Sequence, residues 1–212
     1  MRQRRTLTIR REDHLEDALG ALFFEPAEGN EAHILERLRD YLAPHVSLLR
    51  AEIGSKQMTV EVEAQCFGEE SARLAAEAEK LWSSRGRRAA LAMIKDAMAL
   101  DALNQRAAAT LGTFLLESGA PGEALAALRR AREMGPESAD LLRHLARACL
   151  ALERKSSAVA YLRAAIAIAP QDFPVLRMLD QLGYRRPRRD EAGAGEVAAE
   201  SASPPRNRHR RS

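Results

Sequence analysis

Several residue types and segments are scarce in this 212-residue chain, and each scarcity excludes a class of protein. Aromatic residues make up only 4% of the sequence, which disfavours a β-sandwich and suits helices packed closely through Ala and Leu. The two cysteines, Cys66 and Cys149, lie far apart in no paired motif, so we expect neither a disulfide framework nor a zinc site. No segment approaches the roughly 20 consecutive apolar residues of a membrane-spanning helix. The basic N-terminus also lacks the apolar core of a secretory signal, and we therefore expect a cytoplasmic protein without a membrane partner.

Motifs that carry catalysis are missing as well. Gly54-Ser55-Lys56 lacks the upstream glycine of a phosphate-binding loop. No histidine stands at metal-ligand spacing from another histidine or from a cysteine. The order of the chain also assigns no serine or cysteine nucleophile to a histidine base. We therefore expect no enzyme activity, no cofactor, no metal and no small-molecule substrate.

What the sequence does contain is a unit that recurs every 34 residues. Two consecutive copies span 105–138 and 139–172, and a weaker copy precedes them at 71–104. The recurring residues are small, then large and apolar, then small again, and the last two copies close on proline. They are Ala90, Ala124 and Ala158; Ile94, Leu128 and Leu162; Ala97, Ala131 and Ala165; and Pro136 and Pro170.

This pattern predicts pairs of packed helices. A small alanine lets two helix axes approach to about 8–10 Å, and the larger residue four positions later lies on the same face. Gly119-Ala120-Pro121-Gly122 suits the end of one helix and the start of the next, whereas Pro136 and Pro170 cannot continue a helix. We expect helices at 71–84, 87–100, 105–118, 122–134, 138–152 and 155–168, and a cap helix within 173–183.

The 34-residue unit resembles the tetratricopeptide repeat (TPR), a pair of antiparallel helices. The resemblance rests on Leu111-Gly112, Ala124-x-x-x-Leu128 and Pro136 in the middle copy, and on the matching positions of the last copy. It implies an all-α, TPR-like solenoid of helical hairpins, with about three repeats and a C-terminal cap helix over 71–183. It also implies a concave groove, lined by the first helix of each repeat, that binds a peptide segment of another protein.

The flanking segments differ in charge from the repeats. Residues 1–11 carry five arginines and no acid, and we expect an exposed basic arm. Residues 12–70 are acidic, and their apolar spacing predicts a mainly helical segment, with helices at 13–24, from 31 onward, and again beyond Pro44 to 53. Residues 58–66 alternate like a strand, with 6–10 as the only available partner, or form a helix instead. Residues 184–212 contain few apolar residues, and we expect a disordered basic tail.

The acidic front segment allows two interpretations. It is either an ordinary solvated surface or a clamp that folds back over the basic groove.

The resemblance places seven candidate binding residues in the groove: Arg106, Thr113, Glu117, Arg143, Arg147, Glu79 and Trp82. Arg143 and Arg147 share a helix face and, with Arg106, suit an acidic or C-terminal carboxylate ligand. The alternative is that Arg143 pairs with Asp140 on a solvated face. Trp82 either anchors the ligand or packs the junction between the front segment and the first repeat. Ala75 and Glu79 stand where the chaperone-binding branch of the family has Lys and Asn, so that specificity is not implied.

These observations predict a non-catalytic scaffold, an adaptor or co-chaperone, that binds a peptide segment of a partner protein. An acidic segment suits the groove arginines. A solenoid that docks on an enzyme and regulates it is equally compatible with the sequence. The alternative partner is nucleic acid, bound through the Arg-rich arm and tail.

Overall fold

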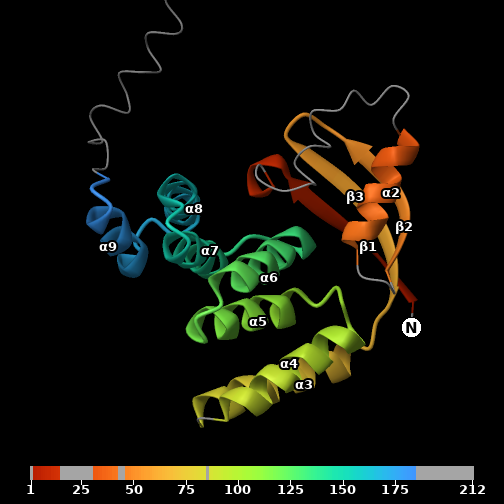
Figure 1. The fold of residues 1–212 in the computed structure, drawn as a ribbon, viewed down its shortest axis with the longest axis horizontal. Helices are drawn as coiled ribbons and strands as arrows, with labels where there is room; N and C mark the ends of the chain where they lie inside the picture. The colour runs from red at the N-terminus through yellow and green to blue at the C-terminus, as the bar shows by residue number, and fades with distance from the viewer. Residues whose placement is uncertain (1, 15–30, 43–45, 85, 185–212) are drawn as a thin grey trace, which may run out of the picture.

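The structure is a computed structural model that describes residues 2–14, 31–42, 46–84 and 86–184 (Figure 1). Within these residues a small sheet with one α-helix and one short 3-10 helix (Arg11–Asp13) precedes a succession of helical hairpins. Figure 1 shows the sheet beside the middle of the helical array, and the last helix at the far end of that array. The predicted helix at 13–24 and the predicted tail at 184–212 lie almost wholly outside the described residues.

The front sheet contains three antiparallel strands in the order β1-β3-β2. These strands are β1 (Arg2–Arg10), β2 (Val46–Ile53) and β3 (Gln57–Gln65). In β1, Leu7 and Ile9 are buried opposite Val60 and Met58 of β3, and the residues between them face the other side. Helix α2 (Glu31–Tyr41) covers the apolar face with residues that include Ile34 and Leu38.

The sheet corrects two predictions for the front segment. Residues 2–10 of the predicted arm are not free, because they form a strand that pairs along its whole length with β3. Residues 46–53 form a strand rather than a continued helix, and the described front segment is therefore not mainly helical. Residues 57–65 form the strand that the sequence left open, with the partner that it offered. Local apolar spacing favoured helix, but three strands together bury an apolar face that no one of them could bury alone.

Seven helices follow in the described part of the repeat region. They are α3 (Gly68–Ser83), α4 (Arg87–Leu100), α5 (Gln105–Glu117), α6 (Pro121–Met134), α7 (Ala139–Ala151), α8 (Lys155–Ile168) and α9 (Phe173–Gln181). The prediction of a solenoid of helical hairpins with a terminal cap helix is confirmed.

Small residues hold the hairpins together at the predicted positions. Ala90, Ala124 and Ala158 are all 0% exposed, so each is enclosed between neighbouring helices rather than facing water. Gly112 lies at a close helix crossing, because a Cβ at this position would come within 2.5 Å of the Leu128 side chain. The α5–α6 hairpin therefore requires glycine at this crossing.

The residues that cap the helix N-termini recur every 34 residues, as the buried alanines do. Asn104, Ser138 and Asp172 each accept a hydrogen bond from the backbone N–H three residues later, at 3.1, 3.2 and 3.1 Å. These N-caps satisfy backbone donors that the helix itself leaves free. The first helix of the second and third repeats and the cap helix thus start at a fixed, capped residue.

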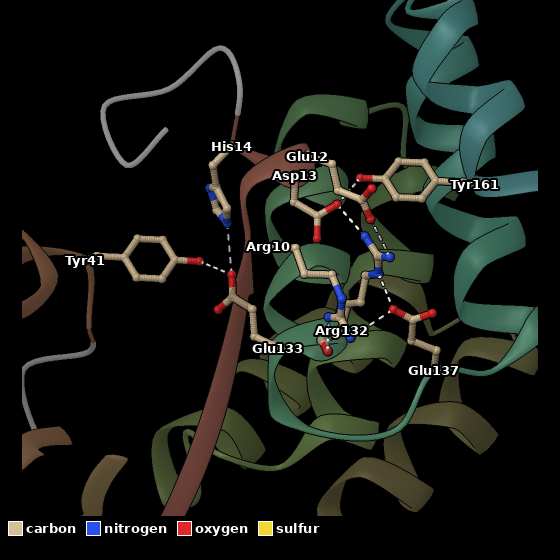
Figure 2. A network of polar contacts seen from close by, with 9 residues as sticks. All are labelled: Arg10, Glu12, Asp13, His14, Tyr41, Arg132, Glu133, Glu137 and Tyr161. Carbon is tan, nitrogen blue, oxygen red and sulfur yellow. Dashed lines mark hydrogen bonds and ion pairs between the residues drawn. The ribbon is translucent and has the colours of Figure 1, made fainter. Parts of the chain in front are cut away.

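The sheet and α2 together, with the short 3-10 helix, form what we call the front domain (described residues within 2–65). This domain docks on the second helices of the repeats through buried polar groups (Figure 2). Arg132 of α6 donates to Asp13 Oδ1 at 2.6 Å, and the Tyr161 hydroxyl of α8 donates to the same oxygen at 2.6 Å. Burial would lower the pKa of Arg132, but Asp13 and neighbouring carboxylates raise it overall, so the guanidinium stays charged. Burial, followed by the adjacent Asp13, raises the pKa of Tyr161, which therefore stays a donor.

A second buried cluster extends this junction. Glu133 of α6 accepts a hydrogen bond from the Tyr41 hydroxyl at 2.6 Å, and His14 Nε2 lies 3.1 Å from the same oxygen. The described part of the front segment thus makes these buried polar contacts with α6 and α8. The clamp over the groove stays a prediction, because residues 15–30 of that segment lie outside the described residues.

Candidate functional site

The first helices of the repeats line a hollow of about 460 Å³ in the middle of the solenoid. Glu79 of α3, Arg106 and Thr113 of α5, and His144 of α7 are among its lining residues. Arg106 donates to Glu79 Oε2 at 2.7 Å, and the Thr110 hydroxyl donates to Glu79 Oε1 at 3.0 Å. The hydrogen bond from Arg106 holds the pKa of Glu79 below its usual range. The opposite charges of this hollow are therefore already paired within the chain.

His144 also lines this hollow, and its surroundings disfavour the protonated, charged imidazole. Burial lowers its pKa, and the charges of Arg147 and Arg143 lower it further. Its Nδ1 is buried and has no hydrogen-bond partner in the described chain. The folded chain therefore favours the neutral imidazole at this position.

A second hollow, of about 500 Å³, lies between the third repeat and the cap helix. Arg143 and Arg147 of α7 line one side, and α9 contributes the other. Arg143 donates to Asp140, as the solvated-face interpretation required, but Arg147 is exposed and has no carboxylate partner among the described residues. The hollow therefore keeps positive charge that the described part of the chain does not neutralise.

Trp82 and Glu117 line neither of these hollows. The Trp82 ring stacks on Phe114 of α5 with centroids 4.0 Å apart, and its Nε1 donates to Glu117 Oε2 at 2.8 Å. Arg87 lies over the same ring, 5.3 Å from its centroid. Trp82 therefore packs the contact between the first and second repeats, and not the junction with the front segment.

The structure thus divides the seven predicted groove residues among the middle hollow, the second hollow, and the contact between the first two repeats, where Trp82 and Glu117 lie. It brings Glu79, Arg106 and Thr113 together in the middle hollow, and Arg143 and Arg147 together in the second. Sequence reasoning missed the contribution of α9, whose Phe173, Pro174, Arg177 and Met178 line the second hollow. The available signal was the spacing of Val175 and Leu179, which buries one face of α9 and leaves Phe173 outside it.

The arginines of the N-terminal strand are partly neutralised. Arg2 and Arg4 lie 3.6 Å from carboxylate oxygens of Glu63, and Arg10 pairs with Glu137 at 3.0 Å. The described N-terminal residues therefore do not form the free basic arm on which the nucleic-acid alternative depended.

Comparison with known proteins relates part of the helical region to a known repeat family. Residues 115–182 match the family model described as tetratricopeptide repeat. Residues 115–182 are therefore similar to tetratricopeptide repeats, and the predicted resemblance is confirmed over that range. No curated protein sequence matches the chain significantly. Among the helices of the described residues, none combines the length and the apolar composition of a membrane span.

Solved structures share the fold of the TPR region at low sequence identity. The first TPR domain of Spaghetti (RPAP3), bound to the HSP90 peptide SRMEEVD, has a TM-score of 0.54 and 13% identity, covering 56% of this chain and 94% of that one. The Arabidopsis OM64 TPR domain has a TM-score of 0.52 and 18% identity, covering 54% and 94%. The Hsp90 co-chaperone Cns1 of Saccharomyces cerevisiae has a TM-score of 0.51 and 16% identity, covering 62% and 43%.

Proposed function

We propose that this protein is a non-catalytic scaffold whose TPR groove binds an extended peptide segment of a partner protein. The observation that carries the proposal is the pair of hollows along the first helices of the repeats, of about 460 and 500 Å³, which share α7. The described front domain docks on α6 and α8 and leaves these hollows open. Curved repeat arrays offer such continuous surfaces to extended ligands.

The structural neighbours support the class of ligand. The Spaghetti (RPAP3) domain was solved with a bound HSP90 peptide, and Cns1 is an Hsp90 co-chaperone. The residues of this chain argue against taking over the chaperone specificity itself. Ala75 is fully buried, and Glu79 is a carboxylate already paired with Arg106, so neither can hold the carboxylate of a ligand.

A selection from a phage-displayed library of random peptides on the full chain tests the proposal. We expect a family of related peptides to be enriched, and hydrogen exchange to slow on α3, α5 and α7 when a synthetic copy of an enriched peptide binds. The double variant Arg143→Glu/Arg147→Glu should lose most of the binding. Arg88→Glu/Lys95→Glu is the matched control, because both residues are exposed on α4, which lines neither hollow.

The proposal fails if no peptide is enriched, or if the protected amides lie outside the repeats. It also fails if the groove variant and the α4 control bind equally well.

A further inference from the structure

The second hollow is formed by side chains of two separate helices, α7 and α9, which the sequence alone did not bring together. We name it the cap-helix pocket and define it by Arg143, Arg147, Phe173, Pro174, Arg177 and Met178. One wall comes from the first helix of the last repeat and the other from the cap helix. The cap helix therefore does more than close the core, because its outer face completes a concave site.

The cap-helix pocket carries three guanidinium groups. Arg147 and Arg177 are exposed, and neither has a carboxylate partner in the described part of the chain. Arg143 is partnered by Asp140, whose side chain is 73% exposed, so solvent screens this pair. An incoming carboxylate would meet arginines from two different helices. Charge complementarity therefore favours an acidic ligand at this place.

Phe173 supplies an aromatic surface beside these charges. It is 78% exposed, the most exposed of the large apolar side chains in the described residues. Its neighbours on α9 fix the helix without it, because Val175 and Leu179 are buried against the repeats and Asp172 caps the first turn. The ring is therefore held on a rigid element, with the partly buried Met178 in the same pocket. Exposed aromatic residues on fixed backbones are common anchors in protein interfaces.

We propose that the cap-helix pocket is a subsite that binds an acidic residue of the partner peptide together with a neighbouring apolar side chain. The carboxylate is held by Arg147 and Arg177, and the apolar side chain packs on Phe173 and Met178. This inference rests on the proposed function and adds the chemistry of one part of the ligand. A peptide fits better than a nucleic-acid strand, because the pocket offers one ring and none of the repeated aromatic side chains on which successive bases stack.

The experiment uses the peptides enriched on the full chain and measures binding of labelled copies by fluorescence anisotropy. The test variants are Phe173→Ser and Arg177→Gln, two exposed positions whose replacement leaves the buried face of α9 intact. Leu49→Ser and Arg88→Gln are matched controls, because Leu49 is 45% exposed on β2 and Arg88 is exposed on α4. Thermal unfolding of every variant checks that the fold is retained.

We expect the enriched peptides to share an acidic residue next to a bulky apolar one. Each pocket variant should weaken binding by about tenfold or more, as is typical of an anchor residue, and the controls by less than about twofold. Replacing the acidic residue of the peptide by its amide should weaken binding to the unaltered chain, and should have little further effect on Arg177→Gln.

Three results would overturn the inference. If peptides bind the groove but Phe173→Ser and Arg177→Gln bind them as well as the unaltered chain, the subsite is wrong while the proposed function stands. If no peptide is enriched, both are wrong. If a labelled poly-thymidine strand binds at physiological salt and both pocket variants abolish that binding, the pocket serves nucleic acid instead.

Discussion

Replacing Arg132 by Met should undock the front domain from the repeats. The Arg132 side chain is 5% exposed and contacts three carboxylates: Asp13 at 2.6 Å, Glu12 at 2.8 Å and Glu137 at 2.9 Å. Asp13 matters most, because its side chain is 1% exposed, whereas Glu12 is 65% exposed and screened by water. Methionine fills much of the arginine stem but leaves the Asp13 carboxylate buried without its cation.

The expected cost follows from this burial. Removing one partner of a buried ion pair costs about 3–5 kcal/mol, because the other charge stays uncompensated. The Tyr161 hydroxyl still donates to Asp13 Oδ1, so we expect the lower end, about 3 kcal/mol. The double variant Asp13→Leu/Arg132→Met should be more stable than Arg132→Met alone, because it removes the stranded charge. Arg88→Met, at an exposed position, should change stability by less than about 0.5 kcal/mol.

Urea unfolding followed by circular dichroism measures these free energies, and hydrogen exchange locates the opening. In Arg132→Met the amides of β1 should exchange faster, whereas those of α4, outside the junction, should change least. Fluorescence of Trp82, the only tryptophan, reports separately on the contact between the first two repeats. A loss below about 1 kcal/mol, with unchanged protection of β1, would show that this buried ion pair does not hold the domain.

Two further predictions concern the repeats themselves. Gly112→Ala should destabilise the chain by about 1–3 kcal/mol in chemical denaturation, because the added Cβ collides with Leu128. Gly122→Ala is the control: its Cβ would have no atom within 4 Å, so the change should be neutral or stabilising by up to about 1 kcal/mol. Equal effects of the two variants would refute the close approach at Gly112. Burial and two adjacent arginines lower the pKa of His144, so its neutral form is preferred on folding, and this stability is lost as the pH falls through the lowered pKa. The unfolding free energy should therefore fall more steeply between about pH 7 and pH 5 for the unaltered chain than for His144→Gln, and parallel curves would contradict this.

The repeat helices could be predicted from the sequence because their determinants are local. The predicted ranges 87–100 and 155–168 coincide with α4 and α8, since glycine, proline and the spacing of small residues fix where each helix begins, ends and packs. Neighbouring repeats are also adjacent in sequence, so the register of one unit predicts its contact with the next.

The front domain could not be predicted in the same way. Leu49 and Ile53 have helical spacing, yet 46–53 is a strand, because β3 offers a paired edge and α2 covers the resulting face. The pairing of β1 with β3 joins residues 47 to 63 positions apart. Alternation offered 6–10 as a partner for 58–66, but the local pattern left strand and helix both open.

The sequence by itself determined the period, the helix bounds and the buried alanines of the solenoid, because each depends on residues a few positions apart. Only the tertiary structure decided that Asp13 meets Arg132, that Trp82 is used between repeats, and that Phe173 and Arg177 join Arg147 around one pocket. These contacts connect separate elements, and their positions depend on the curvature of the whole array. Side-chain pairing across such distances is fixed by packing and burial, not by local propensity.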